Sequence, residues 1–178
     1  MIITISGKAG SGKSTVAAEI AKKLKLKHCS IGDLMRQIAK EKKISLPELG
    51  KIAEKDKSID EELDNQQMKL RNKDNFVIDG RLTAFFIPDA DLKIFLDCKD
   101  KVRAERILKD TRKDEKSSTV TEVIKKIKSR EQSERKRYKE YYNVDYYNKR
   151  LYDFIIDTTK ITASRVVDRI IKLAKNIK

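Results

Sequence analysis

Residues 7–15 constrain this chain more than any other segment. They read GKAGSGKST, match the pattern G-x-x-x-x-G-K-[ST], and directly follow the β-branched run IITIS at 2–6. Glycines at 7, 10 and 12 let the backbone curl so that successive N–H groups point at phosphate oxygens. A helix starting near Gly12 adds the positive end of its dipole. The pattern predicts a strand, a phosphate-binding loop (P-loop) and a helix, as at the start of an α/β domain that binds a nucleotide. The predicted phosphate-binding residues are Gly7, Lys8, Ala9, Gly10, Ser11, Gly12, Lys13, Ser14 and Thr15.

The rest of the chain alternates short apolar runs with longer segments of helical periodicity. Residues 76–79, 92–97 and 154–157 read as further strands. Alternating strands and helices predict an α/β fold with a parallel sheet. At 178 residues and without a linker-like segment, the chain is expected to form a single domain over 1–178.

Two segments, 33–73 and 99–142, contain several helical stretches without a strand between them. In a sheet of this kind, such insertions lie at the carboxyl ends of the strands, where ligands bind. Three serine or threonine residues are followed three positions later by glutamate and predict capping boxes at helix starts. These pairs are Ser45 with Glu48, Ser58 with Glu61, and Thr119 with Glu122.

The charge balance favours anionic partners. The chain has 42 Lys and Arg against 28 Asp and Glu, a formal net charge of +14. Nucleic acid, anionic lipid and nucleotide phosphates are all attracted to such a chain, although a lysine-rich proteome also explains the excess. No run approaches the roughly 18 apolar residues of a membrane span, and the opening MIITIS has no secretory signal features. We therefore expect a cytoplasmic protein.

The cysteines and the histidine suggest little chemistry. Cys29 and Cys98 lie far apart and encode neither a disulfide framework nor a zinc site. The only histidine, His28, is expected to have a structural role beside a strand rather than to act as a base.

Asp79, Gly80 and Arg81 follow one another at the end of the predicted strand 76–79. A carboxylate beside the P-loop would hold Mg²⁺ together with the Ser14 hydroxyl, directly or through water. Arg81, on a turn loosened by glycine, could hold a phosphate through two parallel hydrogen bonds. An ordinary exposed turn is the alternative.

A second basic group follows from helical spacing. Arg130, Glu134 and Arg137 share one helix face, as do Arg103 and Arg106. Because the planar guanidinium group suits phosphate, these arginines are candidates for phosphate binding. The alternative is that they lie on solvent-exposed helix faces and form ion pairs there. Arg36, after the residues SIGD at 30–33, completes the group.

Seven segments together resemble the cytidylate kinase family, the archaeal branch most of all. Besides the P-loop they are GDLMR (32–36), IDEELDNQQ (59–67), DGR (79–81), PDADLKIFLD (88–97), VRAER (102–106) and SREQSERKRY (129–138). Their order covers essentially the whole chain. The resemblance implies a nucleoside monophosphate kinase-like P-loop fold, in which helices flank a five-stranded parallel sheet. It also implies a helical acceptor-binding insertion at about 33–73 and a lid at about 109–138. Such enzymes transfer the γ-phosphoryl group of ATP to CMP or dCMP, giving CDP or dCDP and ADP, with Mg²⁺.

The resemblance also assigns roles to individual residues. The catalytic residues would be Lys13, Arg81, Arg130 and Arg137. Arg103 and Arg106 would face ATP, while Ser14 and Asp79 would bind the metal. The acceptor site would comprise Asp33, Arg36, Asp64, Gln67, Arg81, Arg130, Glu134 and Arg137. Bacterial members have a small hydroxyl residue where Ile31 stands here, so Asp64 or Gln67 is expected to supply hydrogen bonds to the base instead.

Other functions remain open at this point. The acceptor could be AMP, UMP or a non-nucleotide alcohol. All six tyrosines lie between 138 and 152 among basic residues, which would also suit an RNA-associated, adenylate-kinase-like ribosome assembly factor. Tyrosines that pack the lid helix onto the core are the expected arrangement.

The amphipathic helix at about 162–176 could lie on a membrane, but we expect it to pack on the sheet. We expect a monomer with small-molecule substrates, without a specific nucleic acid or membrane partner.

Overall fold

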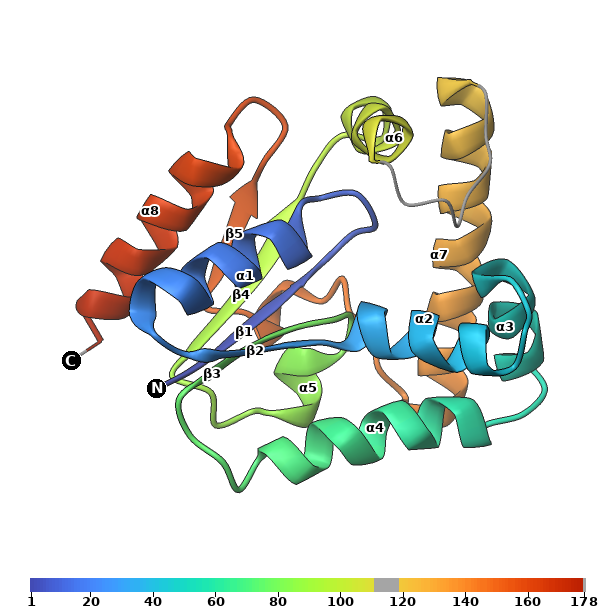
Figure 1. The fold of residues 1–178 in the computed structure, drawn as a ribbon, viewed down its shortest axis with the longest axis horizontal. Helices are drawn as coiled ribbons and strands as arrows, with labels where there is room; N and C mark the ends of the chain where they lie inside the picture. Colours follow the sequence, from blue (N-terminus) through green and yellow to red (C-terminus); the bar gives the residue numbers. More distant parts are fainter. Residues whose placement is uncertain (111–118, 178) are drawn as a thin grey trace.

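The computed structural model describes residues 1–110 and 119–177 and contains a five-stranded parallel sheet (Figure 1). Its strands are β1 (Ile2–Gly7), β2 (Lys27–Ser30), β3 (Phe76–Asp79), β4 (Leu92–Asp97) and β5 (Phe154–Asp157). The strand order is β2-β3-β1-β4-β5. The predicted fold class is therefore confirmed, and the strand that precedes the P-loop, β1, lies at the centre of the sheet.

Strand register brings the chemistry-bearing ends of the strands together. Ile5 on β1 pairs with Asp79 at the end of β3, and Gly7 pairs with Leu96 on β4. Because all neighbours run parallel, the P-loop and Asp79 emerge at the same edge of the sheet.

One face of the sheet is covered by α1 (Lys13–Leu24) and α8 (Ala163–Lys175) (Figure 1). Val16 and Ile20 of α1 and Val167 and Ile170 of α8 are buried in one core cluster with Ile5 of β1 and other sheet residues. Burial of this apolar stripe confirms that the C-terminal helix packs onto the fold. No helix within the described residues is both long and apolar enough for a membrane span.

The expected succession of helices after β2 is confirmed. It comprises α2 (Ile31–Glu41), α3 (Leu46–Ala53) and α4 (Ser58–Leu70), which form their own apolar cluster around Leu49 and Leu63. Ser45 makes the predicted capping box, since its Oγ accepts from the Glu48 N–H at 3.3 Å and its own N–H donates to Glu48 at 2.7 Å.

The second predicted capping box is wrong. Ser58 is the first residue of α4, whose N-cap, Lys57, has helical backbone angles and makes no side-chain cap bond. The Ser58 N–H instead donates to Asp56 at 2.9 Å. The chain already turns into the helix one residue before the serine, so the hydroxyl is misplaced for capping.

The second half of the chain contains α5 (Thr83–Phe86), α6 (Asp100–Lys109), α7 (Val120–Tyr142) and the short 3₁₀ helix η1 (Lys149–Leu151). Thr119 caps α7 by accepting from the Glu122 N–H at 3.2 Å, which confirms the hydroxyl half of the predicted capping box. Part of the expected lid, 111–118, lies outside the described residues. The boundaries of the lid and of the acceptor-binding insertion stay predictions.

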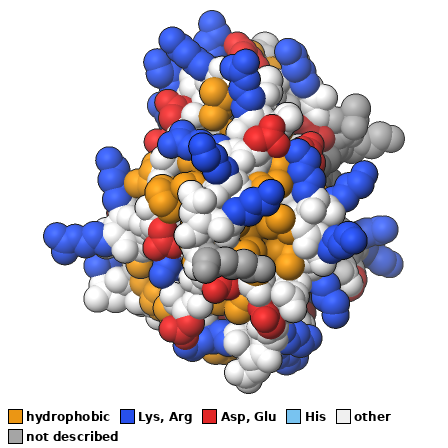
Figure 2. Space-filling view, turned by 90° about the vertical axis from the view of Figure 1, so that its left-hand side faces the viewer, with side chains coloured by type: hydrophobic (Ala, Val, Ile, Leu, Met, Phe, Trp, Pro, Cys, Tyr) orange, Lys and Arg blue, Asp and Glu red, His pale blue; other side chains and the backbone are white. Residues whose placement is uncertain are grey.

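The tyrosines pack α7 and the following loop onto the core. Tyr138 and Tyr146 are buried in a cluster with Leu82 and Phe95. All six tyrosines lie in the described part of the chain, and none is exposed. This confirms the interpretation that the tyrosines pack the helix onto the core. On the face seen in Figure 2, lysine and arginine side chains are spread out, with acidic and apolar side chains between them.

Candidate active site

The P-loop has the backbone angles that its glycines predict. Gly7, Gly10 and Gly12 have φ values of 145°, 73° and 94°. A Cβ at position 7 would lie 2.3 Å from the Leu96 carbonyl oxygen, and one at position 10 would lie 2.8 Å from that of Arg103. Side chains at 7 and 10 would collide with backbone, so the loop passes closely between β4 and α6.

Lys13 and Ser14 open α1 at the centre of the site. The Lys13 ammonium donates to the Lys8 carbonyl at 2.8 Å. Burial lowers the pKa of Lys13, and Arg81 lowers it further. Ser14 Oγ donates to Asp79 Oδ2 at 2.8 Å, which places the hydroxyl and the carboxylate side by side.

Asp79 is held from β2 as well as from the P-loop. It is 2% exposed, and its Oδ1 lies 2.8 Å from His28 Nε2. Ser30 Oγ donates to Oδ2 at 3.3 Å. His28 thus lies on β2 itself rather than beside a strand, and it orients a candidate metal ligand, neither of which sequence reasoning anticipated.

Glu134 of α7 joins two arginines. Arg81 Nε donates to it at 2.7 Å and Arg130 Nε at 2.9 Å, while Arg81 Nη1 also donates to the Gly7 carbonyl at 2.9 Å. Burial would raise the pKa of Glu134, but the two guanidinium groups lower it to about 2. The carboxylate is therefore ionised and holds both arginine forks at the P-loop.

A second buried group connects α4 with α7. Arg137 Nη1 donates to Asp60 Oδ2 at 2.5 Å, with both residues under 5% exposed. One turn further along α4, Asp64 accepts a hydrogen bond from the Tyr142 hydroxyl. Burial raises the pKa of Asp64 to about 6. Gln67, the next residue on this face, is 2% exposed.

Two cavities meet at the P-loop. The first, of about 180 Å³, reaches from the P-loop to α2 and α4. Of the predicted site residues, it is lined by Ala9, Gly10, Lys13, Ser14, Arg36, Asp64, Gln67, Asp79, Arg81, Arg130 and Glu134. The second, of about 650 Å³, lies on the α8 side and is lined by Gly10 to Thr15 and Arg106. Gly10, Lys13 and Ser14 line both cavities.

Asp33, Arg103 and Arg137 line neither of these two cavities. Asp33 is exposed and accepts from Arg36 at 2.6 Å. Arg137 lies behind Asp60, as described above.

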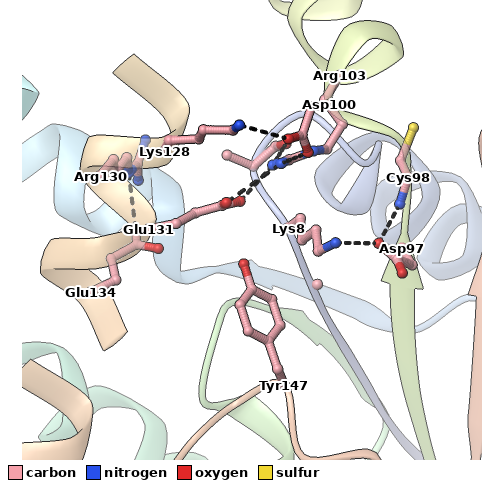
Figure 3. A network of polar contacts seen from close by, with 12 residues as sticks. Lys8, Asp97, Cys98, Asp100, Arg103, Lys128, Arg130, Glu131, Glu134 and Tyr147 are labelled. Carbon is pink, nitrogen blue, oxygen red and sulfur yellow. Dashed lines mark hydrogen bonds and ion pairs between the residues drawn. The ribbon is translucent and has the colours of Figure 1, made fainter. Parts of the chain in front are cut away.

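The Arg103 side chain reaches between Asp100 and Glu131 (Figure 3). Its guanidinium is 1% exposed and donates to the Ala9 carbonyl at 3.0 Å, to Glu131 of α7 at 2.5 Å and to Asp100 at 2.5 Å. These partners favour a role in supporting the loop over the expected contact with ATP.

Arg106 differs from Arg103 because it faces the second cavity. It donates to the Thr158 carbonyl at 2.6 Å and to the Ser11 carbonyl at 3.4 Å. Arg106 therefore lies next to the P-loop, and its contact with ATP stays a prediction.

The site has the parts of a phosphoryl-transfer enzyme, and sequence comparison agrees. A family model described as "Cytidylate kinase-like family" matches residues 2–160. The chain belongs to the cytidylate kinase-like family. Curated relatives named "Cytidylate kinase" include that of Pyrococcus horikoshii, 43% identical over 160 residues, which are 90% of this chain and 81% of the relative. That of Methanocaldococcus jannaschii is 40% identical over 182 residues, covering 100% of this chain and 99% of the relative. The predicted family is confirmed.

Solved structures share the fold of this cytidylate kinase-like chain at low identity. An uncharacterized protein from Eubacterium ventriosum has a TM-score of 0.72 and 21% identity, with 97% of each chain covered. Shikimate kinase from Bacteroides thetaiotaomicron has a TM-score of 0.67 and 16% identity, with 98% of each chain covered. At these identities the likeness shows the fold alone.

Several residues of this cytidylate kinase-like site escaped sequence reasoning. Asp60 and Tyr142 bind Arg137 and Asp64, respectively. The spacing of Asp60 and Asp64, four residues apart in a helical segment, could have placed both carboxylates on one face. Nothing in the sequence indicates that Tyr142, far along the chain, would reach Asp64.

Proposed function

We propose that this protein transfers the γ-phosphoryl group of ATP to CMP or dCMP, giving CDP or dCDP and ADP. The observation that carries the proposal is the meeting of two cavities at one P-loop, with Gly10, Lys13 and Ser14 common to both. A donor in the larger cavity and an acceptor in the smaller one would present their phosphates to the same lysine. The relatives named cytidylate kinase support the choice of acceptor.

The arginines of the site suit the transfer itself. Phosphoryl transfer depends on in-line positioning and on neutralising charge on the transferred group, so no general base is needed. Arg81 and Arg130 lie between the P-loop and α7, both oriented by the ionised Glu134. Their charges would stabilise the transferred group in the transition state.

Ser14 and Asp79 suit a magnesium ion whose other ligands come from the substrate and from water. Mg²⁺ typically takes one or two protein oxygens and keeps several waters or phosphate oxygens. A hydroxyl and a buried carboxylate 2.8 Å apart beside the P-loop match that demand. No group of three or more His, Cys, Asp or Glu within residues 1–110 and 119–177 could hold a metal ion alone. When bound, the ion would neutralise charge on the donor phosphates. His28 and Ser30 keep the Asp79 carboxylate oriented toward Ser14.

The smaller cavity would hold the acceptor. Arg36 and Arg81 would bind its phosphate, and Asp64 and Gln67 its base. Asp33 and Arg137 would act by orienting Arg36 and Asp60.

The test is an ADP-release assay across AMP, CMP, dCMP, UMP and GMP, with Arg130→Ala as the key variant. We expect turnover to favour CMP or dCMP, and the variant to lower kcat by about 10³-fold because a positioned arginine is worth about 10³–10⁵. Fold and ATP binding should be retained, since Arg130 is at the surface of the cavity. Arg135→Ala, which removes an exposed arginine of the same helix, is the matched control. Equal turnover of all nucleotides, or an unaffected Arg130→Ala enzyme, would contradict the proposal.

A further inference from the structure

Gln67 has an unusual position for an amide side chain. It is 2% exposed, lines the smaller cavity, and its Oε1 has no hydrogen-bond partner within the described residues. A buried polar atom without a partner destabilises the fold, so such atoms are rare unless something binds them. A carbonyl oxygen of this kind accepts a hydrogen bond and cannot donate one.

Asp64 determines which end of the Gln67 amide is available. Gln67 Nε2 lies 3.4 Å from Asp64 Oδ1, while the other Asp64 oxygen accepts from Tyr142. An ionised carboxylate only accepts hydrogen bonds, so the amide nitrogen of Gln67, and not its oxygen, faces Asp64. The amide oxygen is thereby left for another donor. Asp60 cannot supply one, since its carboxylate is bound to Arg137.

The surroundings of Gln67 suit a flat ring. Met35 of α2, Leu46 of α3 and Leu63 of α4 line the same cavity and provide apolar surface. Apolar walls with a few placed polar groups are the usual form of a small-molecule site. Both polar groups at this end, Asp64 and the Gln67 oxygen, are acceptors. They therefore suit a ring edge that carries an N–H donor.

We propose that Gln67, oriented by Asp64, accepts a hydrogen bond from the 4-amino group of the acceptor base and so makes the enzyme prefer cytosine to uracil. This rests on the proposed function. Cytosine has an amino donor at this position, and its ring nitrogen accepts. Uracil has a carbonyl oxygen there, which would face the amide oxygen and leave both without a donor. An amine at the same edge of adenine would satisfy Gln67 equally, so this residue does not explain discrimination against AMP.

The test compares kcat/KM for CMP and UMP in the wild type and in Gln67→Leu, which keeps the side-chain size but removes the acceptor. We expect the CMP/UMP ratio to fall at least tenfold, because a site built around a hydrogen bond loses its preference with that bond. Gln66→Leu is the matched control, since Gln66 is the exposed neighbour on α4 and its loss should leave the ratio unchanged. The ratio is measured because a general loosening of the helix would lower kcat/KM for both substrates together and leave their ratio unchanged.

Asp64→Asn provides a second variant that does not depend on the folding of Gln67→Leu. An asparagine amide can donate or accept, so Gln67 would be free to turn and the CMP/UMP ratio should again fall. A ribonucleotide of 2-pyrimidinone has only hydrogen at C4. In the wild type its kcat/KM should be lower than that of CMP by the same factor by which Gln67→Leu lowers kcat/KM for CMP. Gln67→Leu should not lower kcat/KM for this analogue any further.

The outcomes separate the two levels of inference. If the wild type does not phosphorylate CMP, the proposed function fails. If the wild type prefers CMP to UMP and neither Gln67→Leu nor Asp64→Asn changes that preference, the proposed function stands and the role of Gln67 is refuted.

Discussion

Arg103 offers a direct test of how the P-loop is supported. Its guanidinium binds the Ala9 carbonyl of the loop, Glu131 of α7 and Asp100 of its own helix. Arg103→Met retains most of the side-chain length and removes the charge. Glu131 is then left buried without its cation, and the Ala9 carbonyl loses a donor.

The magnitude follows from the burial of the partners. Removing one member of a buried ion pair costs about 3–5 kcal/mol. The Glu131 side chain is 12% exposed, but that of Asp100 is 42% exposed and regains water after the substitution. We therefore expect the lower end, about 3 kcal/mol. In a chain of 150–250 residues each kcal/mol shifts Tm by about 2–4 °C, which gives a fall of about 6–12 °C.

Urea unfolding followed by circular dichroism measures this loss, and a double variant tests its cause. Arg103→Met combined with Glu131→Leu removes both charges, so it should be more stable than Arg103→Met alone. Arg71→Met, which breaks an exposed pair with Asp89, is the control and should change stability by at most about 1 kcal/mol. A loss below 1 kcal/mol for Arg103→Met, or a double variant less stable than the single one, would refute the reasoning.

Two further predictions concern Glu134 and the capping boxes. The pKa of Glu134 is about 2 in the folded protein against an ordinary 4.5, so its stabilising contribution is complete above pH 4.5 and declines as the pH falls toward 2. The stability difference between the wild type and Glu134→Gln should therefore be smaller at pH 3 than at pH 7 in urea titrations, and an equal difference would contradict the assigned pKa. Ser45→Ala should lower the free energy of unfolding by about 1 kcal/mol through the lost cap. Ser58→Ala should leave it within about 0.5 kcal/mol because that hydroxyl caps nothing, and equal losses from the two would contradict the capping assignment.

Residues with strong local signals were predicted well. The P-loop, the runs 76–79, 92–97 and 154–157, and the helices after β2 were found because periodicity and glycine spacing act over a few residues. β2 was not identified from the residues, since KHCS is short, lies at a sheet edge, and carries two exposed positions. Only the family resemblance implied a fifth strand.

The sequence predicted which residues belong to the site better than it predicted which partners they contact. Helical spacing placed Arg130, Glu134 and Arg137 on one face, and the structure confirms that spacing. It could not tell that Arg137 points to Asp60 while Arg130 reaches the cavity, because partners from distant helices decide between them. The same spacing argument treated Arg103 and Arg106 alike, although packing between α6 and α7 buries one behind the loop.

The inner face of α7 is anchored at three successive levels. Glu131 holds α6, Glu134 holds the turn after β3, and Arg137 holds α4, each through a buried ion pair. A tilt of the whole helix would have to exchange all three partnerships at once. Through Arg137, α4 is thus connected to the helix whose glutamates bind Arg81 and Arg103, and these arginines are two of the side chains that donate hydrogen bonds to P-loop carbonyls.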